Sequence, residues 1–93
     1  MEQEEVTRIR MPRRSELLGE ITEVLGGSRL KVKCKDGKER LCRIPGKQRR
    51  RVYLRVSDIV IVKPWDIEPD EKADVVWVYN KTHKQMILKK GLI

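Results

Sequence analysis

The sequence has few of the residues that carry most enzyme chemistry. Among its 93 residues it has one histidine, His83, two cysteines, Cys34 and Cys42, and no phenylalanine. These cysteines are too few and too far apart for a zinc cluster, and a small disulfide scaffold normally carries more of them. We expect both to be reduced thiols in the core. We predict no catalytic residue, metal site or cofactor, and a chain this short excludes a two-domain enzyme.

Long hydrophobic runs are also missing. No apolar stretch approaches the roughly 20 residues that a membrane span requires, and residues 1–5 are acidic where a secretory signal is basic. We therefore expect a cytoplasmic protein without a membrane partner. Val, Leu and Ile nevertheless make up 26 of the 93 residues, which is above the roughly 20% below which chains tend to stay disordered. The chain should fold as one small domain.

Positive charge is present in excess. Lys and Arg number 22 against 14 Asp and Glu, which gives a formal net charge of +8 and an isoelectric point of about 9.8. The segment from Arg29 to Arg55 holds twelve basic residues and only two acidic ones, Asp36 and Glu39. Single lysines often serve only to protect sheet edges, but clustered guanidinium groups suit phosphate recognition. This segment is the predicted binding surface, with nucleic acid as the first candidate partner.

The hydrophobic pattern predicts five strands and a helix. Apolar and polar residues alternate from Leu17 to Leu25, where Gly19 predicts a bend or bulge, and most regularly from Arg29 to Lys35. Asp36-Gly37 is a hairpin signal. The other predicted strands are 39–44, 58–63, an aliphatic run expected to be covered on both sides or to lie in a barrel wall, and 73–79. A helix is predicted over 81–90, with Asn80 as N-cap and Gly91 at its end.

These elements predict a fold class and three regions. Five short strands with glycine turns and a cationic strand pair are typical of the OB-fold, an all-β barrel that binds oligonucleotides. A small SH3-like barrel is the structural alternative. We expect a flexible N-terminal tail over 1–14, basic in its later part, the barrel over 15–79, and a helical extension over 80–93. In the strand 39–44, Arg40 and Cys42 alternate with Leu41 and Arg43, so its inward side stays open.

Aromatic residues are scarce, and this bears on the expected target. The sequence has four: Tyr53, Trp65, Trp77 and Tyr79. Proteins that hold flexible single strands by stacking usually expose several rings, so folded RNA, met through its phosphates and shape, is the favoured target. Trp65, at a strand end, is the ring most readily placed on the surface, and packing across the barrel mouth is its alternative.

Several motifs are specific in combination. They include Arg-Met-Pro-Arg-Arg at 10–14, Gly-Gly-Ser-Arg at 26–29, Arg-Ile-Pro-Gly-Lys at 43–47 with the arginines that follow, and Lys-Pro-Trp at 63–65. In these motifs, which span residues 10–79, the sequence resembles the archaeal and eukaryotic translation initiation factor 1A family, relatives of bacterial initiation factor one. No long acidic segment follows the helix in this sequence, which favours the archaeal form.

The resemblance implies an OB-fold factor that binds the decoding region of the small ribosomal subunit, at the A site. It implies that the factor contacts ribosomal RNA and helps initiator Met-tRNA and mRNA take their places, with other initiation factors as further candidate partners. We expect a monomer. RNA contacts are expected from Lys31, Lys33, Arg40, Arg43, Lys47, Arg49, Arg50, Arg51, Arg55 and Trp65. The basic part of the tail, expected to reach along the decoding groove, comprises Arg8, Arg10, Arg13 and Arg14.

Two other functions stay open at this point. A general RNA chaperone of cold-shock type fits the charge and the fold, but the Phe-rich stacking motifs of that class cannot exist in a sequence without Phe. A small nuclease would depend on His83 or on an acidic pair such as Asp70 and Asp74. His83 lies in a predicted surface helix, where a histidine is usually a solvated side chain.

Overall fold

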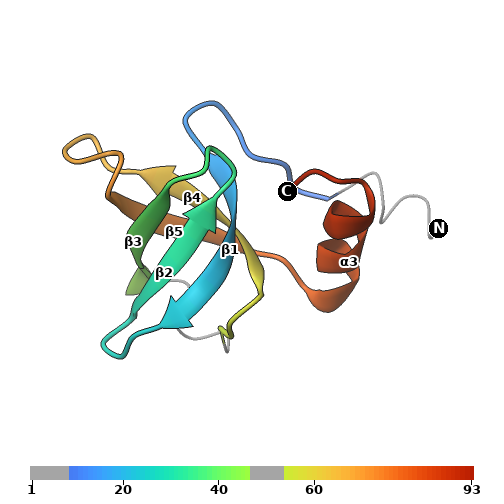
Figure 1. The fold of residues 1–93 in the computed structure, drawn as a ribbon, viewed down its shortest axis with the longest axis horizontal. Helices are drawn as coiled ribbons and strands as arrows, with labels where there is room; N and C mark the ends of the chain where they lie inside the picture. Colours follow the sequence, from blue (N-terminus) through green and yellow to red (C-terminus); the bar gives the residue numbers. More distant parts are fainter. Residues whose placement is uncertain (1–8, 47–53) are drawn as a thin grey trace.

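The computed structural model describes residues 9–46 and 54–93, which form a closed five-stranded barrel with one helix beside it (Figure 1). The strands close in the order β1-β2-β3-β5-β4, with β3 and β5 parallel and every other pair antiparallel. The elements are β1 (Leu17–Val24), β2 (Arg29–Cys34), β3 (Glu39–Arg43), β4 (Ile59–Pro64), β5 (Lys72–Val78) and α3 (Lys81–Lys89). The predicted OB-fold barrel is confirmed, and each element lies within one residue of its predicted range.

Two hydrophobic clusters lie on opposite faces of β4. Val60 and Val62 belong to the cluster inside the barrel, whereas Ile59 and Ile61 belong to a second cluster outside it. All four side chains are fully buried, so the aliphatic run is covered on both sides as predicted. This double burial explains why the strand shows no alternation in its sequence.

Both cysteines lie inside the barrel as free thiols, which confirms the prediction. Cys42 lies on β3 opposite Leu30 of β2. Burial raises the pKa of both thiols, that of Cys42 to about 12. Both are therefore protonated at neutral pH and behave as small apolar side chains.

The helix α3 packs against the outer cluster through a single fully buried residue, Ile87, which joins Leu18 and Tyr79. Asn80 caps it as predicted, because its Oδ1 accepts a hydrogen bond from the backbone N–H of His83 at 2.8 Å. Gly91 follows the helix with a positive φ of 67°. In the part of the chain that the structure describes, no helix is long and apolar enough to cross a membrane.

Gly19 does not mark the bulge in β1. The register shift in β1 falls between Ile21 and Glu23, so the bulge is not at the glycine. Gly19 pairs with Cys34 of β2 and with Val60 of β4 at once. A Cβ atom at this position would lie 2.3 Å from the Cγ1 atom of Val32. The glycine is therefore required for the close approach of two strands.

The strand β5 changes its inward parity at a bulge. The register between β4 and β5 shifts so that Val76 is an extra residue. Val75 lies inside the barrel before the bulge and Val78 packs there after it, whereas Tyr79 joins the outer cluster. Strict alternation along the strand would place Val75 and Tyr79 on one face, and the bulge places them on opposite faces.

Ile9 and Arg10 of the N-terminal segment contact the rest of the described chain. Ile9 packs against the outer cluster, and the hydroxyl of Tyr79 donates a hydrogen bond to the carbonyl oxygen of Arg10. The flexible tail over residues 1–14 stays a prediction. Residues 1–8, with Arg8, lie outside the described residues.

Candidate nucleic-acid interface

A row of outward-facing charged side chains crosses four strands of the barrel. The pairing register places Arg29 of β2 opposite Arg43 of β3, and Arg43 opposite Asp74 of β5. Asp74 in turn lies opposite Lys63 of β4. Neighbouring strands are about 4.8 Å apart, so these four residues form one continuous strip, which we call the cationic row. It carries three cations and one carboxylate, and all three cations are exposed.

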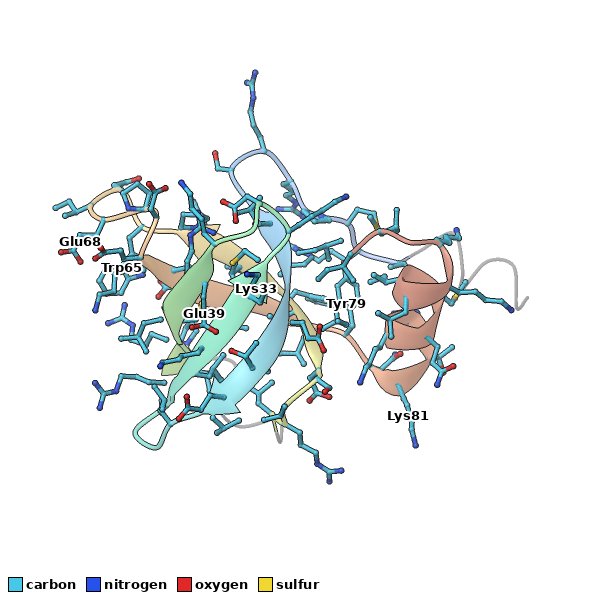
Figure 2. The ribbon with its side chains drawn as sticks, viewed as in Figure 1. Lys33, Glu39, Trp65, Glu68, Tyr79 and Lys81 are labelled. Carbon is cyan, nitrogen blue, oxygen red and sulfur yellow. The ribbon has the colours of Figure 1, made fainter. Side chains whose placement is uncertain are left out.

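Trp65 lies against this row. The guanidinium carbon of Arg43 is 5.3 Å from the centroid of the Trp65 ring, and the indole N–H donates to Oδ1 of Asp74 at 2.9 Å. The Nε atom of Arg43 is 3.5 Å from the same carboxylate oxygen. Trp65 is half-buried and lines a surface groove with Arg43, Lys63 and Asp74. Of the two placements predicted for this ring, the structure has the one on the surface, at the end of the molecule away from Tyr79 and α3 (Figure 2).

Arg55 lies near the same row. It lines a second groove together with Arg29, Ile44 and Leu54. Ile44 and Leu54 lie near the two ends of the segment 47–53, which the structure does not describe. Both pack against the cluster inside the barrel. The segment 47–53 carries four of the predicted RNA contacts and lies outside the described residues: Lys47, Arg49, Arg50 and Arg51.

The outer face of β2 is less cationic than its sequence predicts. The Nζ atom of Lys31 is 3.6 Å from a carboxylate oxygen of Glu23. Lys33 lies opposite Glu39 on one neighbouring strand and opposite Glu20 on the other, and Figure 2 shows Lys33 and Glu39 close together. Carboxylates of β1 and β3 therefore offset these two lysines, and only the end of β2 at Arg29 joins a run of cations.

Arg40 is buried, which corrects the prediction that it contacts RNA. Its side chain is 3% exposed, and its two terminal nitrogens donate to the carboxylate oxygens of Asp36 at 3.0 and 2.9 Å. Its Nε–H donates to the carbonyl oxygen of Pro69 at 2.6 Å. The hydrogen bonds from Arg40 hold the pKa of Asp36 below its usual value. The inward side of β3 is therefore the side of Arg40 and Cys42.

Arg10 of the N-terminal segment contacts residues outside the cationic row. Arg10 pairs with Glu16 through two hydrogen bonds of 3.3 Å and lies 5.6 Å from the centroid of the Trp77 ring. Burial raises the pKa of Glu16, but the hydrogen bonds from the Arg13 N–H and from Arg10 together lower it by more, so the pKa lies below its usual value. Arg13 and Arg14 are exposed. Of the predicted tail contacts, Arg10 is thus already engaged within the chain.

The residues considered for a nuclease are not brought together. Asp70 pairs with Lys38 at 2.8 Å, Asp74 with Trp65, and His83 lies in α3. Within residues 9–46 and 54–93, no group of three or more His, Cys, Asp or Glu side chains is placed to hold a metal ion.

Two members of the cationic row were missed by the sequence reasoning, Lys63 and Asp74. Arg29 lies in the predicted binding segment but was not named among the expected RNA contacts. Gly37 in the hairpin is the sequence signal that could have placed Arg29 opposite Arg43. Gly37 has a φ of 89°, and the Cys34 N–H donates to the carbonyl oxygen of Lys38. A three-residue loop of this kind fixes the register of the two strands. Asp74 and Lys63 join the row through the pairing of β5 with β3 and β4, which no pattern of neighbouring residues in the sequence predicts.

The barrel and the cationic row together define a single-domain OB-fold protein with a surface suited to phosphate groups. The family "Translation initiation factor 1A / IF-1" matches residues 5–93, and the chain belongs to this family. The predicted resemblance is thereby confirmed.

The chain is similar to translation initiation factors 1A from archaea. It is 46% identical to that of Methanothermobacter thermautotrophicus, over 97% of this chain and 91% of the relative. It is 45% identical to that of Pyrococcus abyssi, over 100% and 82%, and 48% identical to that of Methanococcus maripaludis strain C7, over 94% and 86%.

Two solved structures share the fold. The solution structure of the translation initiation factor one from the wolbachia endosymbiont strain TRS of Brugia malayi matches with a TM-score of 0.54 and 25% identity, covering 77% of this chain and 85% of that one. The crystal structure of YjeQ from Thermotoga maritima matches with a TM-score of 0.57 and 19% identity, covering 70% of this chain and 23% of that one. At that identity, the second likeness concerns the fold alone.

Proposed function

We propose that this protein binds the small ribosomal subunit at the decoding region, around the A site, through ribosomal RNA. There it promotes the binding of initiator Met-tRNA and mRNA. It acts by occupying the site and biasing the conformation of the subunit, so no bond is made or broken. It works in the cytoplasm as a monomer, without a metal or cofactor, beside other initiation factors.

The cationic row with Trp65 is the observation that supports this proposal most directly. Two of its cations are arginines, whose planar forks of donors match phosphate oxygens. Two carboxylates face these three exposed cations: Asp74, which is already engaged by the indole N–H and by Arg43, and Asp66, which lines the same groove as Trp65. The row therefore offers an excess of positive charge to an RNA backbone, and Trp65 adds a partly exposed ring for contact with a base or ribose.

The remaining proposed contacts flank the row. Arg55 shares a groove with Arg29, and the arginine-rich segment 47–53 lies between Gly46 and Leu54 in the chain. Lys31 stands next to Arg29 along the outer face of β2, and Lys33 lies beyond it among carboxylates. Arg13 and Arg14, which are exposed, form a separate contact together with Arg8.

Chemical footprinting of ribosomal RNA on isolated small subunits tests the proposal. We expect protection confined to the decoding region, and an affinity that falls steeply with salt, each phosphate contact contributing about 0.7 to 0.9 to the log–log slope. Unstructured RNA serves as the control ligand. Equal affinity for random single strands and for subunits would support the chaperone instead, and salt-insensitive binding would contradict the electrostatic basis of the proposal.

A further inference from the structure

Arg40 is the only charged side chain that is buried among the described residues. A buried charge destabilises a protein unless hydrogen bonds and an ion pair compensate it. Here the guanidinium satisfies that condition by joining two elements. Its terminal nitrogens bind Asp36 in the hairpin between β2 and β3, and its Nε–H binds the carbonyl oxygen of Pro69 between β4 and β5.

The segment that Arg40 holds is residues 65–71, which we call the Trp65 loop. At its base, the Trp65 N–H donates to the carbonyl oxygen of Lys72 at 3.0 Å, and the Leu41 N–H donates to that of Glu71 at 2.8 Å. On its far side the loop is held by side chains of the hairpin. Arg40 binds Pro69, and the Nζ atom of Lys38 is 2.8 Å from Asp70.

This geometry accounts for an arginine at position 40. The two hydrogen-bond acceptors, a carboxylate and a backbone carbonyl, belong to different elements and require donors that diverge from one rigid group. The same guanidinium also lies 3.9 Å from a carboxylate oxygen of Asp70 in the loop. A guanidinium provides such a planar fork, whereas the ammonium of lysine is a single point of charge. The pair with Asp36 is bidentate, which fixes the plane of the guanidinium and so the direction of its Nε–H toward Pro69.

We propose that Arg40 is a positioning residue for RNA binding: with Asp36 it clamps the Trp65 loop so that Trp65 stays stacked on Arg43 over the cationic row. The inference rests on the proposed function. A loop that is already ordered avoids the entropy loss of ordering on binding, and a released loop incurs it. Arg40 therefore acts through Trp65 and does not touch RNA itself.

Asp36→Asn distinguishes a clamp from a direct contact by the sign of its effect. If Arg40 contacted phosphate, removing the negative charge of Asp36 would free the guanidinium and tighten binding to subunits. If Arg40 is a clamp, the same change loosens the loop and weakens binding, although the net charge of the protein becomes more positive. Glu39→Gln is the matched control, because it makes the same charge change one residue from Arg40 on the outward face of β3.

The experiment measures small-subunit affinity at several salt concentrations for the wild-type protein, Asp36→Asn, Arg40→Lys and Glu39→Gln. We expect the two clamp variants to bind roughly three- to tenfold more weakly with an unchanged salt slope, and Glu39→Gln to bind as tightly as wild type or more so. In a Trp65→Ala background, Asp36→Asn should add little further loss, because both changes act on one element. Thermal unfolding confirms that each variant is folded at the temperature of the assay.

Tighter binding of Asp36→Asn overturns the proposal, and so does full additivity of Asp36→Asn with Trp65→Ala. Amide hydrogen exchange of residues 66–71 in the free protein gives a second test that needs no ribosome. Faster exchange in Asp36→Asn than in Glu39→Gln supports the clamp, and equal exchange overturns it. If wild-type protein fails to bind subunits, the proposed function fails, while the exchange measurement still decides whether Arg40 orders the loop.

Discussion

Arg29 lies directly opposite Arg43 on the neighbouring strand, and both side chains are exposed. Like charges in directly opposite positions destabilise a sheet by roughly 0.2 to 1 kcal/mol. Asp74 and the Trp65 ring, both in contact with Arg43, offset part of this repulsion. Two arginines in opposite positions lower the stability of the sheet, and such a pair is expected on a surface where a ligand supplies the missing negative charge.

Replacing Arg43 should therefore separate binding from stability. Arg43 is 59% exposed, so Arg43→Ala should change the melting temperature little. Its affinity for small subunits should fall, and the log–log salt slope should decrease by about 0.7 to 0.9. Lys33→Ala is the control, because Lys33 stands between Glu20 and Glu39, and it should have a smaller effect. A lower melting temperature with intact binding would refute the assigned role of Arg43.

The arginines at 49–51 lie outside the described residues. Their contacts with RNA are predicted from the sequence and from the family. Arg50→Ala should weaken association with small subunits and leave folding unchanged, because removing one cation from an arginine cluster removes charge that serves binding more than stability. Filter binding or fluorescence titration at fixed salt measures the first effect, and thermal unfolding the second. Unchanged affinity would remove Arg50 from the interface.

Gly19→Ala should destabilise the barrel. The added Cβ would lie 2.3 Å from Val32 Cγ1 and 3.2 Å from the carbonyl oxygen of Lys33, so the buried Val32 side chain or one of the two paired strands must shift. Overpacking of this kind costs about 1 to 3 kcal/mol in the free energy of unfolding, measured by urea denaturation. At Gly26 a Cβ would meet no atom within 4 Å, and Gly26→Ala should be neutral or slightly stabilising. Equal stability of the two variants would contradict the close approach at Gly19.

Ile87→Ala should reveal how α3 is attached. Ile87 is the fully buried residue of the helix, and truncating a buried Ile typically costs about 2 to 5 kcal/mol. Leu88, its neighbour, is 49% exposed, and Leu88→Ala should change the free energy of unfolding by no more than about 0.5 kcal/mol. Urea denaturation of both variants compares them. Similar losses at both positions would indicate that the helix packs differently.

The raised pKa of the Cys42 thiol predicts that the folded protein loses stability at alkaline pH. Burial raises the pKa of this thiol from 9.0 to about 12. A pKa that is higher in the folded state favours folding fully below the pKa of the unfolded chain, and this contribution is lost as pH rises through the folded value. Stability should thus decline between pH 9.0 and about 12. The decline should be shallower in Cys42→Ala, as urea denaturation at each pH would show, and identical slopes would contradict the account.

Much of the fold was predictable because its signals are local. Alternation with a period of two located β1 to β3, turn residues bounded them, and Asn80 and Gly91 marked the ends of α3. Interactions between strands were less predictable. A two-residue turn at Asp36-Gly37 would pair Arg29 with Ile44, whereas the three-residue loop pairs it with Arg43. One residue of register decides whether the two arginines are neighbours.

The sequence by itself determined the number of strands, the helix, the reduced core cysteines and the family, because these depend on patterns within a few neighbouring residues or on whole motifs. Only the tertiary structure decided which of the positively charged side chains are available to a ligand. Arg40 is engaged by Asp36 and by Pro69, Lys33 is flanked by carboxylates of two strands, and Arg29 joins the cationic row. The charge of a side chain is written in the sequence, but whether water and ligands reach it depends on what the fold places opposite it.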